Sequence, residues 1–238
     1  MRCMRYFLSF ILLLFLIGWG VKVSAVNTGF TTRPLTEEER NRILPNINIS
    51  LTKTEPVRGS IECFDVNDSE MIAIGQSKGD RIEVCVYSQD GIFMYGYALS
   101  DNGPFGVEWD GNDINIYRVR SDLIVTVDRN GNIKDIAEVE NTSENNSYER
   151  YLLSSTERNT DDARFYIRND MGALNIFAFS HSQLVMERPD GEEIIIYDVN
   201  DTQLARTIIC LIVFISFFVA AIVIPVRYCI VSNSGTQQ

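Results

Sequence analysis

Histidine and paired cysteines, which many metal and nucleophilic sites require, are nearly absent from this sequence. Its 238 residues include one histidine, His181, and five cysteines with no Cys-x-x-Cys pair, which excludes the usual zinc sites. The chain has no Gly-x-Ser-x-Gly elbow, phosphate loop or dinucleotide fingerprint. His181, between two serines, is interpreted as a solvent-facing or hydrogen-bonded loop residue. We therefore predict no catalytic residue, no metal site and no cofactor, and we expect that the protein is not an enzyme.

Basic residues are scarce in the middle of the chain. Residues 26–206 contain 17 of the 21 lysines and arginines but all 32 aspartates and glutamates, so this stretch has a formal charge of −15. A surface this acidic argues against nucleic acid as a partner, because phosphate contacts need lysine and arginine. It also disfavours docking of this surface onto anionic lipid.

The N-terminus has the pattern of a secretory signal. Arg2 and Arg5 precede an apolar stretch over 6–19, and the small-residue triplet 23–25 follows. This pattern predicts a signal peptide with Ala25 as the last residue removed. An uncleaved anchor is the alternative, although a spanning helix needs roughly 17–25 residues.

A second apolar segment predicts a transmembrane helix. Residues 207–226 contain no charged residue, and Arg206 and Arg227 flank them. A helix without a polar face is typical of a membrane span. Because Arg2 and Arg5 favour a cytoplasmic N-terminus, the middle of the chain is expected outside the cytoplasm and the C-terminus inside. We predict a single-pass protein of the cell membrane.

A short helix is expected over 37–44. Thr36 is placed to cap it, and Glu39 stands three residues later as the partner in a capping box. Pro45 marks its end. Ile43 and Leu44 are expected to pack inward.

From residue 47 onward, short β-forming runs alternate with turn dipeptides such as Asp-Gly and Asn-Gly, which supply the positive φ of tight hairpins. The stretches 105–131 and 165–191 align without a gap, and an earlier copy runs over 64–91 with one extra residue. Each repeat is expected to hold four strands: a Phe-led run, an Ile/Leu-x-Ile run such as 114–116 or 174–176, an apolar run and, after the Gly turn, a last run.

These repeats, over 64–99, 105–139 and 165–199, resemble β-propeller blades of the NHL or WD-repeat kind. The whole chain resembles small uncharacterised membrane-anchored proteins of bacteria, a resemblance that implies location and architecture but no activity. Propellers typically have four to eight blades. Residues 46–57 and the insert 141–162 could add an irregular fourth blade, the stack could stay open, or a second chain could close it.

The predicted organisation has five parts. These are a signal peptide or anchor (1–25), a stalk with a short helix and a strand (26–60), an all-β repeat domain (61–204), a transmembrane helix (205–227) and a short cytoplasmic tail (228–238). Cys63 and Cys85 are expected on the first and third strands of one repeat. Strands about 4.8 Å apart would separate their Cα atoms by about 9.6 Å, too far for a disulfide, so we predict free thiols.

Three acidic turns offer oxygen ligands that calcium could use, at 65–68, 110–113 and 128–132. None has the ligand spacing of an EF-hand loop, so hairpin turns are the favoured interpretation. The turn at 128–132 is predicted to join the last two strands of its repeat. Only three residues suggest a binding patch, because the third repeat does not share them: Trp109, Arg118 and Arg120.

We therefore expect a membrane-tethered extracytoplasmic β module that binds an envelope protein or a glycan, or that scaffolds an envelope assembly. Propeller-like surfaces are often binding platforms, although fold does not fix function. One alternative is an exported propeller-like hydrolase or lyase. Another is a sensor domain that acts through a membrane partner, because the tail is too short to be a signalling domain.

Overall fold

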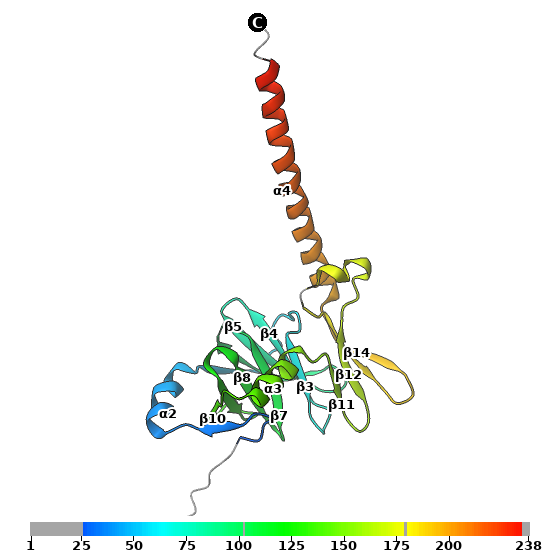
Figure 1. Ribbon diagram of the computed structural model, residues 1–238. Coiled ribbons are helices and arrows are strands. Elements are labelled where there is room, and N and C mark those ends of the chain that lie inside the picture. Colours follow the sequence, from blue (N-terminus) through cyan, green and yellow to red (C-terminus); the bar gives the residue numbers. More distant parts are fainter. Residues whose placement is uncertain (1–25, 102, 179, 235–238) are drawn as a thin grey trace, which may run out of the picture.

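The computed structural model describes residues 26–101, 103–178 and 180–234, which form three antiparallel sheets and a long C-terminal helix, α4 (Asn200–Ser234) (Figure 1). The expectation of a mostly β domain followed by an apolar helix is confirmed. The predicted signal peptide or anchor, 1–25, lies outside the described residues.

The first sheet is a meander with one added edge strand. Its strands follow the order β2-β6-β5-β4-β3. Consecutive strands pair antiparallel from β3 to β6, and β2 pairs with β6. Their bounds are β2 (Ile49–Thr52), β3 (Cys63–Val66), β4 (Ile72–Lys78), β5 (Arg81–Tyr87) and β6 (Phe93–Ser100).

The second sheet repeats this plan. Strands β7 to β10 form the meander, and β1 pairs with β10, which gives the order β1-β10-β9-β8-β7. A short 3₁₀ helix, η2 (Val119–Ser121), connects β8 to β9. The strand bounds are β1 (Thr32–Pro34), β7 (Phe105–Asp110), β8 (Asp113–Arg118), β9 (Leu123–Val127) and β10 (Ile133–Val139).

The third sheet departs from the predicted plan. Its order is β11-β12-β13-β14, with the bounds β11 (Glu157–Asn159), β12 (Arg164–Arg168), β13 (Gln183–Glu187) and β14 (Glu193–Asp198). The strand expected over 174–176 is wrong, because these residues belong to a 3₁₀ helix, η3 (Gly172–Phe177). The Phe-led strand β12 pairs directly with β13 and occupies the place of that strand.

Local hydrogen bonds favour the η3 conformation. Gly172 has a φ of +57°, and the side-chain oxygen of Asn175 accepts a bond from the Met171 backbone N–H at 2.8 Å. The insert 141–162 supplies the missing strand, because β11 pairs with β12 at the edge of the sheet. The third sheet therefore has four strands, but not the four that the repeat pattern predicted.

The first sheet is the middle layer of the domain. Alternate side chains of each strand point to opposite faces. On one face Val84 and Val86 pack in a cluster with Ile116 of the second sheet. On the other face Ile74 and Cys85 pack in a cluster with residues of the third sheet, including Phe165 and Leu184. Two hydrophobic cores thus hold three sheets together.

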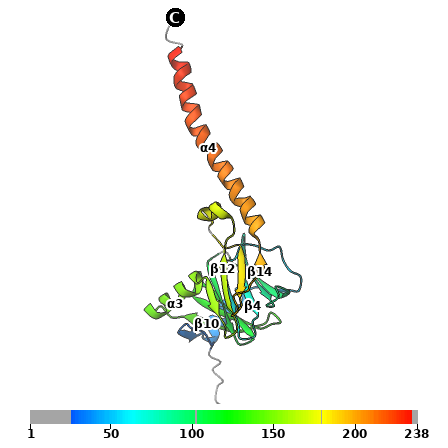
Figure 2. The same cartoon turned by 90° about the vertical axis from the view of Figure 1, so that its right-hand side faces the viewer.

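The outer face of the second sheet is covered by α3 (Ser143–Ser154), which comes from the insert. The Thr142 hydroxyl caps this helix by accepting a bond from the Asn145 N–H at 3.1 Å. Leu152 of α3 packs with Phe30 and Tyr117. Figure 2 shows α3 beside the sheets and α4 extending away from them.

The predicted capping-box helix is confirmed as α2 (Glu37–Ile43), followed by η1 (Leu44–Asn46). The Thr36 hydroxyl accepts a bond from the Glu39 N–H at 3.3 Å, and the Glu39 carboxylate accepts one from the Thr36 N–H at 2.9 Å. Ile43 packs partly against the core between the first and second sheets. The inward position expected for Leu44 is wrong, because Leu44 is 37% exposed at the start of the 3₁₀ turn.

The loop at 128–132 is the hairpin between β9 and β10, as predicted. The Gly131 N–H donates to the Asp128 carbonyl at 2.9 Å, and Gly131 has a φ of +84°. Gly91 and Gly191 make the same bond to the residue three positions earlier, with φ values of +74° and +86°. A left-handed residue at this position suits glycine, which has no Cβ.

The two cysteines of the β domain lie on the strands that the pattern predicted. Cys63 is on β3 and Cys85 on β5, with β4 between them. Both are buried free thiols and belong to different cores. Burial raises the pKa of the Cys85 thiol to about 12, which disfavours the reactive thiolate.

Helix α4 begins one residue after β14 ends, with only Val199 between them. Its stretch Asn200–Ala221 is long and apolar enough to cross a membrane, and the most apolar part of this stretch contains no buried residue. A core helix would bury an apolar face, whereas this one exposes apolar side chains on all sides. The β domain is therefore joined to an apolar helix without a flexible linker.

Candidate ligand-binding site beside Trp109

Trp109 is anchored where the first two sheets meet. It lies on β7, an edge strand of the second sheet, so its N–H is not used within that sheet. This N–H donates to the Asp65 carboxylate at 2.8 Å, and the indole N–H donates to the Asp65 carbonyl at 3.3 Å. Asp65 belongs to β3, the edge strand of the first sheet. Asp65 thus accepts a hydrogen bond from a backbone N–H that would otherwise be unpaired at the edge of β7.

The third sheet reaches the same aspartate through Arg158 on β11. Its guanidinium donates from Nε to the second oxygen of Asp65 at 2.9 Å. Arg158 is 8% exposed and lies over the rings of Phe64 and Tyr151 at 5.4 and 5.1 Å from the ring centroids. Asp65 therefore links the edge strands of all three sheets.

The charge of Asp65 depends on these contacts. Burial raises the pKa of its carboxyl, while the Trp109 N–H and Arg158 oppose that change by stabilising the carboxylate. Both carboxylate oxygens already accept hydrogen bonds. Asp65 is consequently a structural acceptor and is poorly placed to act as a general base.

A polar hollow of about 280 Å³ opens beside this junction. The loop from β3 to β4 and the β7–β8 hairpin form its walls, and its lining residues are Asp65, Val66, Asn67, Asp68, Ser69, Trp109, Gly111 and Asn112. Gly111 has a φ of +61°, which turns the hairpin at the rim. Trp109 is half-buried, so part of its ring remains accessible.

Asn67, one of the lining residues, has an unused hydrogen-bond donor. Its side-chain oxygen accepts bonds from the N–H groups of Ser69 and Met71 at 3.0 and 2.9 Å, which fixes the orientation of the amide. Its Nδ2 is buried and has no hydrogen-bond partner in the described part of the chain, and the residue is 7% exposed. An unpaired buried donor costs free energy unless a ligand or water supplies an acceptor.

This set of groups suits an uncharged, hydroxyl-rich ligand. The Asn67 amide donates, the Asp68 carboxylate accepts, and the accessible part of the indole offers an apolar surface. Among the residues described, no three histidine, cysteine or acidic side chains come together in a way that could hold a metal ion. The acidic turn at 65–68 belongs to the β3–β4 hairpin, as predicted, and it also forms one wall of the hollow.

The structure does not bring the three residues of the predicted patch together. Arg118 pairs with Phe105 across the β7–β8 hairpin, four residues along β7 from Trp109. Its guanidinium forms a salt bridge with Asp101 at 2.6 Å. Arg120 lies in η2, where its side chain approaches Gly103. Only Trp109 of the three lines the hollow.

His181 contributes to the fold rather than to this site. Its carbonyl accepts a hydrogen bond from the Ile61 N–H at 2.8 Å, in an isolated bridge between the first and third sheets. Burial of the imidazole lowers its pKa, which favours the neutral form.

Sequence reasoning missed Asn67 and Arg158. The Asp-Val-Asn-Asp run marked the loop of Asn67, but nothing in it distinguished an amide with a buried, unpaired nitrogen from one that faces solvent. Arg158 carried no local signal, because its partner Asp65 is 93 residues away. In comparisons with known proteins, no family model, curated protein or solved structure matches the chain.

Proposed function

We propose that this protein is a membrane-anchored extracytoplasmic binding module whose hollow beside Trp109 holds a neutral glycan of the cell envelope. The observation that carries the proposal is the buried, unpaired Asn67 donor next to an accessible indole. A sugar ring presents both hydroxyl acceptors and an apolar C–H face, so it complements these two groups.

The proposed anchoring is supported by α4. Its apolar surface is unburied, and it follows the last strand directly. Val26 packs against the cluster that includes Val139 of β10. Strand β10 lies on the side of the domain away from α4 in both views (Figures 1 and 2). An uncleaved N-terminal anchor would have to return along the whole domain to reach the same bilayer, which favours cleavage.

The proposed blade-like arrangement is supported by the edge strands. β3 and β7 lie side by side, and β11 reaches the same junction through Arg158. In a propeller, the first strand of each blade lines a common axis, and neighbouring blades pack face to face. Two contacts support a blade-like arrangement: β3, β7 and β11 meet at Asp65, and the first sheet shares one hydrophobic core with each of the other two sheets.

Fluorescence of Trp109 gives a direct test of ligand binding. The chain contains two tryptophans, Trp19 and Trp109, so a Trp19→Phe variant makes Trp109 the sole reporter. The full chain in mild detergent would be titrated with neutral oligosaccharide fragments of its own cell envelope. We expect a saturable change in emission, because the ligand would cover the indole.

Asn67→Asp gives the matched loss-of-binding variant. It keeps the oxygen that accepts from Ser69 and Met71 but replaces the free donor by a carboxylate oxygen. We expect the fluorescence change to disappear in this variant and to persist in Asn130→Asp, which makes the same substitution in an exposed hairpin. Equal responses of the two variants, or no response of the parent to any neutral fragment, would contradict the proposal.

A further inference from the structure

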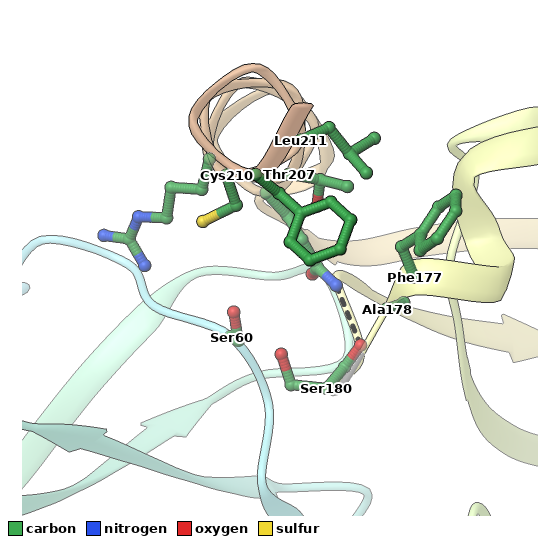
Figure 3. Close-up of a pocket in the computed structure, with 10 residues that line it drawn as sticks. Ser60, Phe177, Ala178, Ser180, Thr207, Cys210 and Leu211 are labelled. Atoms are coloured by element: carbon green, nitrogen blue, oxygen red, sulfur yellow. Dashed lines mark hydrogen bonds between the residues drawn. The ribbon is translucent and has the colours of Figure 1, made fainter. Parts of the chain in front are cut away.

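A second hollow lies where the β domain meets α4. Its volume is about 550 Å³, and it is bounded by the end of η3 on one side and by α4 on the other (Figure 3). Phe177 and Ala178 face Cys210 and Leu211 of the helix across it. Phe214 adds a further apolar wall.

The position of this hollow relative to the bilayer follows from the length of the apolar segment. This step rests on the proposed membrane anchoring. The twenty uncharged residues 207–226 rise about 30 Å as a helix, which is about the thickness of the hydrocarbon core. None of them can be left outside the bilayer without shortening the span. Phe214 lies about 12 Å from Arg206 along the axis of α4. The part of the hollow that Phe214 lines therefore lies within the hydrocarbon core.

The sequence of the β12–β13 connection, which contains η3, agrees with a position at the membrane. The stretch 171–186 contains no lysine, arginine, aspartate or glutamate. The aligned stretch of the second repeat, 111–126, contains four of these residues. Ile176 of η3 is 81% exposed and Phe177 is 43% exposed. Such side chains are unfavourable in water and favourable at a lipid surface.

A polar hollow of about 490 Å³ adjoins the apolar one and shares Ser60, Ser180 and Arg206 with it. Three cations and one carboxylate line the polar hollow. The carboxylate, Glu62, accepts a bond from the Ser77 hydroxyl at 2.8 Å. Two of the cations are engaged: Arg58 binds Glu55 at 2.6 Å, and Lys78 binds Glu83 at 3.1 Å. Arg206 is exposed and forms no salt bridge within the part of the chain that the structure describes.

Gln203 adds an unpaired polar atom to the apolar hollow. Its amide nitrogen donates to the Ser180 carbonyl at 2.8 Å, the dashed line that ends on Ser180 in Figure 3. Its Oε1 is buried and has no partner in the described residues, and the residue is 7% exposed. An acceptor held in this way suits a hydroxyl or ammonium donor.

We propose that the junction binds one phospholipid of the outer leaflet, with an acyl chain between Phe177 and α4 and its phosphate at Arg206. The two adjoining hollows match the two ends of such a molecule, one apolar and one phosphate-bearing. The lipid fills the space between the loop and the helix, and Ile176 lies among its neighbours in the leaflet.

Native mass spectrometry of the full chain tests this assignment. The protein would be reconstituted in nanodiscs that contain phosphatidylethanolamine, whose ammonium can donate to Gln203, and released in the spectrometer. We expect one phosphatidylethanolamine molecule to remain bound to the parent chain. Arg206→Gln should reduce the bound fraction about tenfold or more, the usual effect of removing a charged hydrogen bond. Arg227→Gln, at the other end of the span, is the matched control and should retain the lipid.

A second pair of variants tests the acyl-chain site. Ala178→Trp fills the hollow and should abolish retention, whereas Ala173→Trp, at an exposed position of η3, should not. Equal retention by these two variants, or equal loss with Arg206→Gln and Arg227→Gln, would indicate adventitious lipid only and would overturn the inference. The fraction of chain that enters nanodiscs is measured separately. A chain that stays outside them would contradict the anchoring itself and, with it, this site.

Discussion

The second and third sheets begin from similar sequence patterns and end as different structures. In the second sheet, Ile114 and Ile116 lie on β8 and are fully buried. In the third, the aligned Leu174 and Ile176 lie in η3, where Ile176 is 81% exposed. The second sheet packs between the first sheet and α3, whereas the third carries α4 and the loop beside it. The same apolar alternation thus lies in a core in one place and on an exposed surface in another.

The largest expected loss of stability comes from breaking the junction that holds the second and third sheets to the first sheet. Asp65→Ala leaves the buried Arg158 guanidinium without its carboxylate partner, with only the Glu157 carbonyl as acceptor, and frees the Trp109 N–H. We expect a loss of about 3–5 kcal/mol in the free energy of unfolding, as for other buried pairs that lose one partner. Urea unfolding of the full chain in mild detergent, followed by circular dichroism, measures it.

The matched control is Arg164→Ala, on β12 of the third sheet. Arg164 is exposed, and its bonds to Glu157 and Glu187 are surface salt bridges. Such pairs contribute little, so the change should be much smaller than for Asp65→Ala. If the two variants unfold at the same urea concentration, Asp65 does not hold the edge strands of the three sheets together.

Next in size is the comparison of the two aligned isoleucines. Ile116→Ala leaves a cavity between the first and second sheets and should cost about 2–5 kcal/mol. Ile176→Ala removes an exposed side chain and should change the free energy of unfolding in detergent by less than about 0.5 kcal/mol. The same unfolding experiment measures both. Equal losses would mean that 174–176 forms a buried strand, as the repeat pattern predicted.

Alanine substitutions at the three hairpin glycines, Gly91, Gly131 and Gly191, should destabilise the fold to different extents. All have positive φ, where an alanine costs roughly 1–2 kcal/mol. At Gly91 a Cβ would also meet the Ile196 carbonyl oxygen at 2.6 Å, whereas at Gly131 it would approach Leu51 at 3.1 Å. At Gly191 no atom lies within 4 Å. Thermal unfolding should therefore rank the alanine variants in that order, with Gly91→Ala least stable; a reversed order would contradict the packing of the third sheet on the first.

The smallest effect concerns the edge of the second sheet and its dependence on pH. A hydrogen bond from Arg33, followed by those from Thr36, lowers the pKa of Glu39 from 4.5 to about 2. Because the folded-state pKa lies below the unfolded one, Glu39 stabilises α2 above about pH 4.5. That contribution is lost as the pH falls towards 2.

Hydrogen exchange of the α2 amides is the measurement for this prediction. Protection should decline between pH 4.5 and 2 in the parent chain. In Glu39→Gln it should be lower at neutral pH and nearly constant over the same range. A parent chain with constant protection would show that the Arg33–Glu39 pair does not support the helix.

Several local elements could be predicted because their causes lie within a few residues. The capping box placed α2, and Asn-Gly or Asp-Gly placed the β9–β10 and β13–β14 hairpins. The alternation of apolar residues placed β3 to β10, and with them the separation of Cys63 from Cys85. In contrast, the prediction that Leu44 packs inward is wrong, because α2 gives way to a 3₁₀ turn at this residue and leaves its side chain exposed.

The candidate site was less predictable, because it depends on contacts between distant segments. Trp109 was singled out for its absence from the third repeat, but the arginines chosen with it lie elsewhere. Asp65 and Arg158 meet only because β11, from an insert without a repeat pattern, reaches the edge of β3. No local sequence rule joins residues that are 93 positions apart.

The sequence alone determined the mostly β character of the domain, its tight turns and the apolar C-terminal segment, since each follows from short-range backbone preferences and hydrophobicity. Only the tertiary structure decided which strands fill the third sheet. There β12 takes the place beside β13, β11 completes the edge, and 174–176 is left to form η3. The physical reason is competition: two segments can pair with one strand edge, and packing across the whole domain determines which of them does.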